Sequence, residues 1–192
     1  MIYVVVLFVL LAGSFVAQAF VPTIDWAFRS TLYVVHLVFF SGAVTVSYPV
    51  MLAMAFCAGF AWDALTIVDV PVAAGSVPMT AGSLSFGYSI LLFGMTGSLM
   101  QGIRPLFRRG RWELPVLMAG LAMMTYLTLE YLLLNLMRGG FVFPEAVWYK
   151  ILTMSLMTTM VAPLLFLTLY RLAKLTGYEI RYDGLKTKGN YA

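Results

Sequence analysis

Long runs of apolar residues without a charged side chain constrain this chain more than any other feature. The run from residue 2 to residue 21 contains no Asp, Glu, Lys or Arg, and about 20 apolar residues in a helix span a bilayer. The chain is 62% hydrophobic and 10% charged, whereas a soluble domain has roughly 45–50% apolar and about 25% charged residues. The sequence therefore predicts an all-α integral membrane protein.

Six apolar runs are long enough to predict six transmembrane helices. Pro49 follows Ser47 and Tyr48, and a proline at this place favours a tight turn between two short spans. One long broken helix over 31–65 is the alternative for this region. The six predicted spans cover residues 2–21, 31–47, 49–65, 80–102, 114–137 and 146–172.

The first apolar run has a second interpretation, a cleaved signal peptide. Ala17-Gln18-Ala19 fits the small-residue cleavage pattern, but no Lys or Arg precedes the run, and the run is longer than a usual signal core. A retained helix is favoured. With no internal repeat or linker, the prediction is one transmembrane domain over 1–175 and a short polar cytoplasmic tail over 176–192.

The basic residues predict the orientation in the membrane. With the N-terminus inside, nine of the 12 Lys and Arg fall in the inner loops and tail. Cytoplasmic segments carry an excess of Lys and Arg, so both termini are predicted to be cytoplasmic. The inner residues are Arg104, Arg108, Arg109, Arg111, Arg171, Lys174, Arg181, Lys186 and Lys188, and the outer ones are Arg29, Arg138 and Lys150.

One aspartate interrupts the apolar segment AFCAGFAWDAL, residues 55–65. Ala55, Gly59 and Asp63 are spaced four residues apart, so they share one helix face. Small residues on a face allow a neighbouring helix to approach closely, and a carboxylate facing hydrocarbon is costly. Asp63 is therefore predicted to face protein near the outer end of the third span.

His36 and Glu130 are two further ionisable side chains at a similar depth. The functional interpretation is a polar cluster of His36, Asp63 and Glu130 that binds an ion, a headgroup or a partner. The alternative is that each makes a local hydrogen bond or reaches interfacial water, and this alternative is favoured for His36. One histidine and two carboxylates on three helices have no diagnostic metal-binding spacing.

Other features of the spans have structural interpretations. The stripe of Ser83, Gly87, Gly94 and Ser98 predicts close helix packing rather than a channel lining. Pro163 predicts a kink in the last span, where the hydroxyls of Thr158 and Thr159 are candidates to satisfy the freed backbone groups.

Two connections between the predicted spans differ in character. The apolar outer connection 67–79 indicates a re-entrant segment or a protein contact, whereas the basic connection 104–111 is a topology anchor that touches anionic lipid. Cys57 has no disulfide partner. The chain contains none of the common catalytic or phosphate-binding motifs, so no enzyme activity, catalytic residue, metal or cofactor is predicted, and nucleic-acid binding is remote.

The chain resembles the MreD family, small multi-span proteins of the bacterial rod-shape machinery. The resemblance rests on AFCAGFAWDAL, which is similar to the family segment that contains Gly59 and Asp63. Pro78-Met79-Thr80-Ala81-Gly82-Ser83-Leu84 at the next span and the closing segments 161–166 and 170–172 support it. It covers about residues 30–175. Before the second span, family members often have a proline, whereas this chain has Phe28-Arg29-Ser30-Thr31.

The resemblance implies a non-enzymatic scaffold in the bacterial cytoplasmic (inner) membrane. Such a protein binds an MreC-like bitopic membrane protein and helps to position the glycan polymerase and transpeptidase that build side-wall peptidoglycan. Gly59, Asp63, His36, Glu130 and Pro163 are then candidate structural or partner-interface residues. The family is also similar in fold to the six-helix substrate-binding subunits of energy-coupling-factor vitamin transporters, so a vitamin-type transporter subunit is the alternative function.

Overall fold

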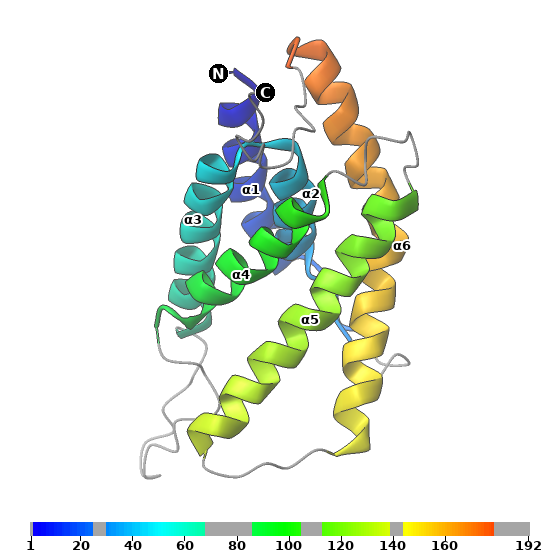
Figure 1. Cartoon of the computed structure of the whole chain (residues 1–192). Coiled ribbons are helices and arrows are strands. Elements are labelled where there is room, and N and C mark those ends of the chain that lie inside the picture. The colour runs from blue at the N-terminus through cyan, green and yellow to red at the C-terminus, as the bar shows by residue number, and fades with distance from the viewer. Residues whose placement is uncertain (1, 25–29, 68–85, 105–112, 139–143, 179–192) are drawn as a thin grey trace, which may run out of the picture.

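The computed structural model describes residues 2–24, 30–67, 86–104, 113–138 and 144–178, and these residues form an all-helical bundle (Figure 1). Within them there is no β-strand, only an isolated bridge between Ile24 and Ser30. This confirms the predicted all-α fold. The six helices are α1 (Ile2–Ala19), α2 (Val34–Thr45), α3 (Tyr48–Ile67), α4 (Tyr88–Gly102), α5 (Glu113–Arg138) and α6 (Glu145–Leu175).

Four of the described helices, α1, α3, α5 and α6, are long and apolar enough to cross a membrane, which indicates a membrane protein. The other two are shorter than their predicted spans. Helix α2 has 12 residues and α4 has 15. At 1.5 Å per residue they reach about 18 Å and about 22 Å, whereas the hydrocarbon core is about 30 Å thick. Residues 80–85 of the predicted fourth span lie outside the described residues.

The helices run alternately up and down between two ends of the bundle. At the upper end of Figure 1, the ring of Tyr3 stacks on Tyr178 with centroids 4.4 Å apart, and its hydroxyl donates to Thr45 Oγ1 over 2.8 Å. The start of α1, the end of α2 and the end of α6 therefore meet there. Ser30 Oγ, before α2, and Thr153 Oγ1 of α6 are 2.8 Å apart, above the end where α5 finishes and α6 begins (Figure 1). We call these the upper and lower ends.

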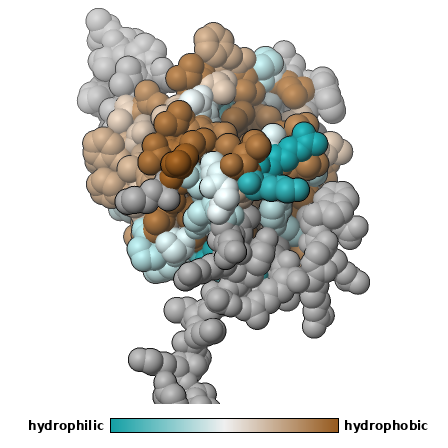
Figure 2. All heavy atoms as spheres, turned by 90° about the horizontal axis from the view of Figure 1, so that it is seen from above, coloured by the Kyte–Doolittle hydropathy of each residue, from teal (hydrophilic) through white to brown (hydrophobic). Residues whose placement is uncertain are grey.

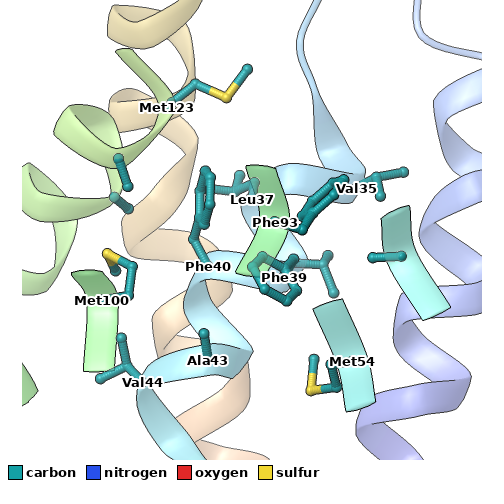
Figure 3. Packing of buried hydrophobic residues seen from close by; sticks show 14 of the residues in the cluster. Val35, Leu37, Phe39, Phe40, Ala43, Val44, Met54, Phe93, Met100 and Met123 are labelled. Atoms are coloured by element: carbon teal, nitrogen blue, oxygen red, sulfur yellow. The ribbon is translucent and has the colours of Figure 1, made fainter. Parts of the chain in front are cut away.

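Helix α2 forms the centre of the bundle. Eleven of its 12 residues are buried, and side chains of α3, α4 and α5 surround it (Figure 3). Phe39 of α2 and Phe93 of α4 meet edge to face with centroids 4.9 Å apart. The helix is hydrophobic on all sides, as expected for a helix that contacts protein all round.

The short α2 ends inside the bundle, where its last carbonyls need protein donors. Gln101 Nε2 of α4 donates to the carbonyls of Ala43 (2.5 Å) and Val46 (2.8 Å). Arg104 donates to the carbonyl of Thr45 over 3.3 Å and is itself buried. The prediction that Arg104 belongs to a loop touching lipid is therefore wrong, because its guanidinium group caps α2.

The first turn of α2 is held in a similar way by α1. Gln18 Oε1 accepts a hydrogen bond from the backbone N–H of Val34 over 2.7 Å, and Gln18 Nε2 donates to the carbonyl of Leu32 over 3.0 Å. Helix α1 also buries Leu7 and Leu11 in the core. The first helix is thus packed into the bundle, and its retention in the mature protein stays a prediction.

Helices α5 and α6 pack closely at Gly120. A Cβ at this glycine would contact Thr159 Oγ1, and Ser155 Oγ donates to the Gly120 carbonyl over 2.6 Å. Helix α6 continues through Pro163. The hydroxyls of Thr158 and Thr159 donate to carbonyls one turn earlier, so the prediction that they satisfy the backbone groups freed by Pro163 is wrong.

The described outer surface is largely apolar. Large hydrophobic side chains are exposed on every long helix, among them Val9, Phe56, Leu121 and Met160. Seen from above, most of the described surface belongs to apolar residues, and hydrophilic residues form a smaller area (Figure 2). An apolar exterior around an apolar core is typical of a protein whose solvent is lipid.

Candidate functional site

Asp63 lies at the lower end of α3 and is buried, with 3% of its surface exposed. Its Oδ2 accepts a hydrogen bond from the backbone N–H of Gly87 over 2.7 Å. Gly87 directly precedes α4, where backbone N–H groups have no partner within the helix and carry partial positive charge. Asp63 therefore caps α4, and it faces protein as the sequence predicted.

Gly59 is one turn above Asp63 and lies against the backbone of α4. A Cβ at Gly59 would contact Ile90 Cα, lie 2.5 Å from the Ile90 nitrogen and lie 2.8 Å from the Ser89 carbonyl carbon. Any side chain at this position thus pushes α3 and α4 apart. Gly59 and Asp63 together form what we call the α3–α4 joint.

The predicted small-residue stripe on the fourth span is only partly a packing surface. Nothing lies within 4 Å of a Cβ built at Gly94, so close packing was a wrong prediction there. Gly97 has this role instead, because its Cβ would lie 2.6 Å from Met51 Sδ and 2.9 Å from Phe39. Gly87 has φ +103°, a conformation that favours glycine, and Ser83 lies outside the described residues.

His36 sits at the lower part of α2, fully buried among aromatic rings. Both ring nitrogens are without a hydrogen-bond partner. The prediction of a local hydrogen bond or of contact with interfacial water was therefore wrong for His36. The surrounding rings come from α3, α4 and α5, from the residue before α2 and from the next turn of α2 itself. The distances from the His36 ring centroid are 4.3 Å to Tyr126, 4.7 Å to Trp62, 4.7 Å to Phe93, 5.1 Å to Tyr33 and 6.3 Å to Phe40.

Glu130 follows Tyr126 by one turn on α5 and is half-buried. It lines a pocket together with Tyr33. His36 contacts Tyr126, one turn before Glu130, and Trp62, the residue before Asp63, so the three ionisable residues lie in one region. Their assignment as a binding site stays a prediction. The structure does not join the three directly by any hydrogen bond among the described residues.

The chemistry available to this region follows from its groups. Aromatic faces stabilise cations, and two carboxyl groups attract positive charge. No group of three or more His, Cys, Asp or Glu side chains that suits a metal ion occurs in the part of the chain that the structure describes. The aromatic rings and the two carboxyl groups suit a cationic or hydrogen-bonding group.

A pocket lies beside this cluster, between the lower halves of α5 and α6, and we call it the α5–α6 pocket. It has a volume of about 160 Å³. Tyr33, Glu130, Tyr131 and Lys150 supply its polar groups, and apolar side chains such as Ile151 supply the rest. Larger grooves on α3 and α4 and on α1 and α3 are almost wholly apolar.

Several predictions for loops and chain ends lie outside the described residues. Of the outer connection 67–79 only Ile67 is described, and of the basic connection 104–111 only Arg104. The tail beyond Tyr178 also lies outside the described residues. Pro163 lies far from the cluster, lining a groove with Val116 and Phe166 towards the upper end. Its assignment as an interface residue stays a prediction.

No protein-family model, curated protein or solved structure matches this chain. Function must therefore be argued from the residues and their arrangement. The feature that the sequence analysis did not identify is a pair of half-buried amides, Gln18 and Gln101. A glutamine inside or beside an apolar run is a signal for an interhelical hydrogen bond.

Proposed function

We propose that this chain is a non-enzymatic scaffold of the bacterial inner membrane, similar to MreD proteins, that binds an MreC-like bitopic partner. One observation carries the proposal. The segment on which the resemblance rests, AFCAGFAWDAL, is the segment that builds the α3–α4 joint. Its glycine and its aspartate each have a defined structural task there, so the two residues are not a chance pattern in an apolar run.

The joint suits a scaffold because it holds the end of α3 against the start of α4. Asp63 holds Gly87, and Gly59 lets α4 lie directly on α3. A partner that docks at the lower end then meets a surface of constant shape, and preorganised surfaces lose less conformational entropy on binding. In this role the chain helps to organise side-wall peptidoglycan synthesis with the glycan polymerase and transpeptidase.

We further propose six membrane crossings, with both termini in the cytoplasm. The stacking of Tyr3 on Tyr178 supports an even number of crossings, because the two ends of the described chain lie at the same end of the bundle. The short α2 begins beside the end of α1 and ends beside the end of α4, and α4 begins beside the end of α3. Topology reporters fused at Arg109 and Ala192 are expected to report the cytoplasm, and one at Val72 the outside. A C-terminus found outside would contradict six crossings.

Depletion of this protein is expected to make rod-shaped cells round, while uptake of vitamins stays unchanged. The reason is that loss of a scaffold disorganises side-wall synthesis without removing a transport step. Cell shape by microscopy and uptake of labelled vitamins would be measured in the same depleted culture. Cells that keep their rod shape but lose uptake would instead support the transporter subunit.

One observation favours that second candidate, a substrate-binding subunit of a vitamin-type transporter. The α5–α6 pocket brings together an acid, a base and two tyrosines at one end of the bundle. Its volume of about 160 Å³ is small, however, since pockets for ligands of drug or cofactor size occupy about 300–1,000 Å³. The scaffold therefore remains the better-supported function.

A further inference from the structure

The α5–α6 pocket differs from the other described pockets in carrying both signs of charge. Glu130 from α5 and Lys150 from α6 line it, yet no ion pair between them occurs among the described residues. Glu130 is half-buried and Lys150 is exposed. A pocket with separated opposite charges is complementary to a ligand that itself carries one positive and one negative group.

The depth of the pocket in the membrane is marked by its neighbours on α6. Trp148 and Tyr149 directly precede Lys150 and are 42% and 54% exposed. Exposed Trp and Tyr concentrate at the level of the lipid headgroups. Lys150, five residues after the start of α6, therefore lies at the boundary between headgroups and hydrocarbon at the lower end of the bundle.

The remaining walls fit the part of a lipid that lies just below its headgroup. Leu127 and Leu134 of α5 and Val147 and Ile151 of α6 are apolar and line the same pocket. The pocket is partly open to the outside of the bundle, so acyl chains attached to a bound headgroup can continue into the bilayer. Its volume of about 160 Å³ is smaller than that of pockets for drug-sized ligands, about 300–1,000 Å³, and suits a small headgroup.

We propose that the α5–α6 pocket binds the zwitterionic headgroup of a phospholipid of the phosphatidylethanolamine type. The ammonium group lies against Glu130 and the ring of Tyr33, because carboxylates and aromatic faces both attract cations. The phosphate group lies against Lys150. This inference goes beyond the scaffold function and does not depend on it, since the binding is a property of the chain without a partner.

The test is lipid binding by the purified full chain in detergent, measured by native mass spectrometry. Short-chain phosphatidylethanolamine and short-chain phosphatidylglycerol, which lacks the ammonium group, are titrated in parallel. We expect phosphatidylethanolamine to bind about tenfold more tightly than phosphatidylglycerol. A difference of this size corresponds to one hydrogen bond to a charged group. Equal affinity of the wild-type chain for the two lipids would overturn the proposal.

Three variants test whether Glu130 binds the ammonium group and Lys150 the phosphate group. Glu130→Gln is expected to remove the preference for phosphatidylethanolamine, and Lys150→Gln is expected to weaken the binding of both lipids. Lys174→Gln, which changes an exposed lysine near the other end of α6, serves as the matched control and is expected to bind like wild type. Lys150 is exposed, so its variant reports on the site even where Glu130→Gln lowers the thermal midpoint of unfolding.

Soluble phosphoethanolamine distinguishes the source of the headgroup. It carries the same two charges without acyl chains, so we expect it to bind much more weakly than the lipid. If it binds as tightly as the lipid, the pocket takes a free zwitterion and the lipid assignment is wrong. If Glu130→Gln keeps the full preference for phosphatidylethanolamine, the ammonium site is wrongly placed.

Discussion

Replacing Gly59 with alanine adds only one methyl group, yet it is expected to destabilise the bundle strongly. The new Cβ would lie 2.5 Å from the backbone nitrogen of Ile90, and a backbone atom cannot move aside as a side-chain tip can. Helices α3 and α4 must separate, which strains the hydrogen bond from Gly87 to Asp63. Overpacking of this kind costs about 1–3 kcal/mol, seen as a lower thermal midpoint in detergent.

Gly94→Ala is the matched control for this experiment. Gly94 also belongs to the α3–α4 pair, but nothing lies within 4 Å of its Cβ position. Alanine at this helical site is expected to be neutral or to stabilise by about 0.5–1 kcal/mol. Equal midpoints for Gly59→Ala and Gly94→Ala would show that α4 does not lie on Gly59.

Changing Asp63 to leucine is expected to impair partner binding, whereas Asp63→Asn is expected to be mild. Leucine leaves the N–H of Gly87 without its acceptor, at a cost of about 1–3 kcal/mol, and frees the start of α4 from α3. Asparagine keeps an oxygen acceptor in the same place. Co-purification with the MreC-like partner, compared at equal expression, measures the effect.

Thr66→Val provides the control at the same end of α3. The Thr66 hydroxyl donates only within its own helix, to the carbonyls of Trp62 and Asp63, so its loss should leave partner binding unchanged. Normal binding by Asp63→Leu together with failure of Asp63→Asn would mean that charge itself is required. The structural role of Asp63 would then not explain its importance for the partner.

The parts of the fold that follow from local pattern could be predicted from the sequence. Charge-free runs predicted the helices, and Pro49 correctly indicated that the chain breaks between α2 and α3. The four-residue spacing of Gly59 and Asp63 correctly indicated a protein-facing side of α3. These inferences rest on helix periodicity and on the cost of burying charge, which need no knowledge of neighbouring helices.

What could not be predicted depends on which helices meet. Gly97 and Gly120 are close contacts while Gly94 is open, and nothing in their sequence neighbourhoods distinguishes the three. The length of α2 was overestimated because apolar residues before and after it continue the run without continuing the helix. His36 was expected to find a hydrogen bond, and only the positions of Trp62, Phe93 and Tyr126 reveal its aromatic surroundings.

The enclosed position of α2 has a consequence for the biogenesis of the protein. During synthesis α2 emerges before α3, α4 and α5, the helices that will enclose it. It also emerges before Gln101 and Arg104, whose side chains will donate hydrogen bonds to its last carbonyls. Newly inserted, it is a helix too short for the bilayer with unpaired backbone groups at its end, an unfavourable state in lipid. Only α1, through Gln18, is already present to hold it. We therefore expect these hydrogen bonds from α1 to help hold α2 in place until the second half of the chain has been made.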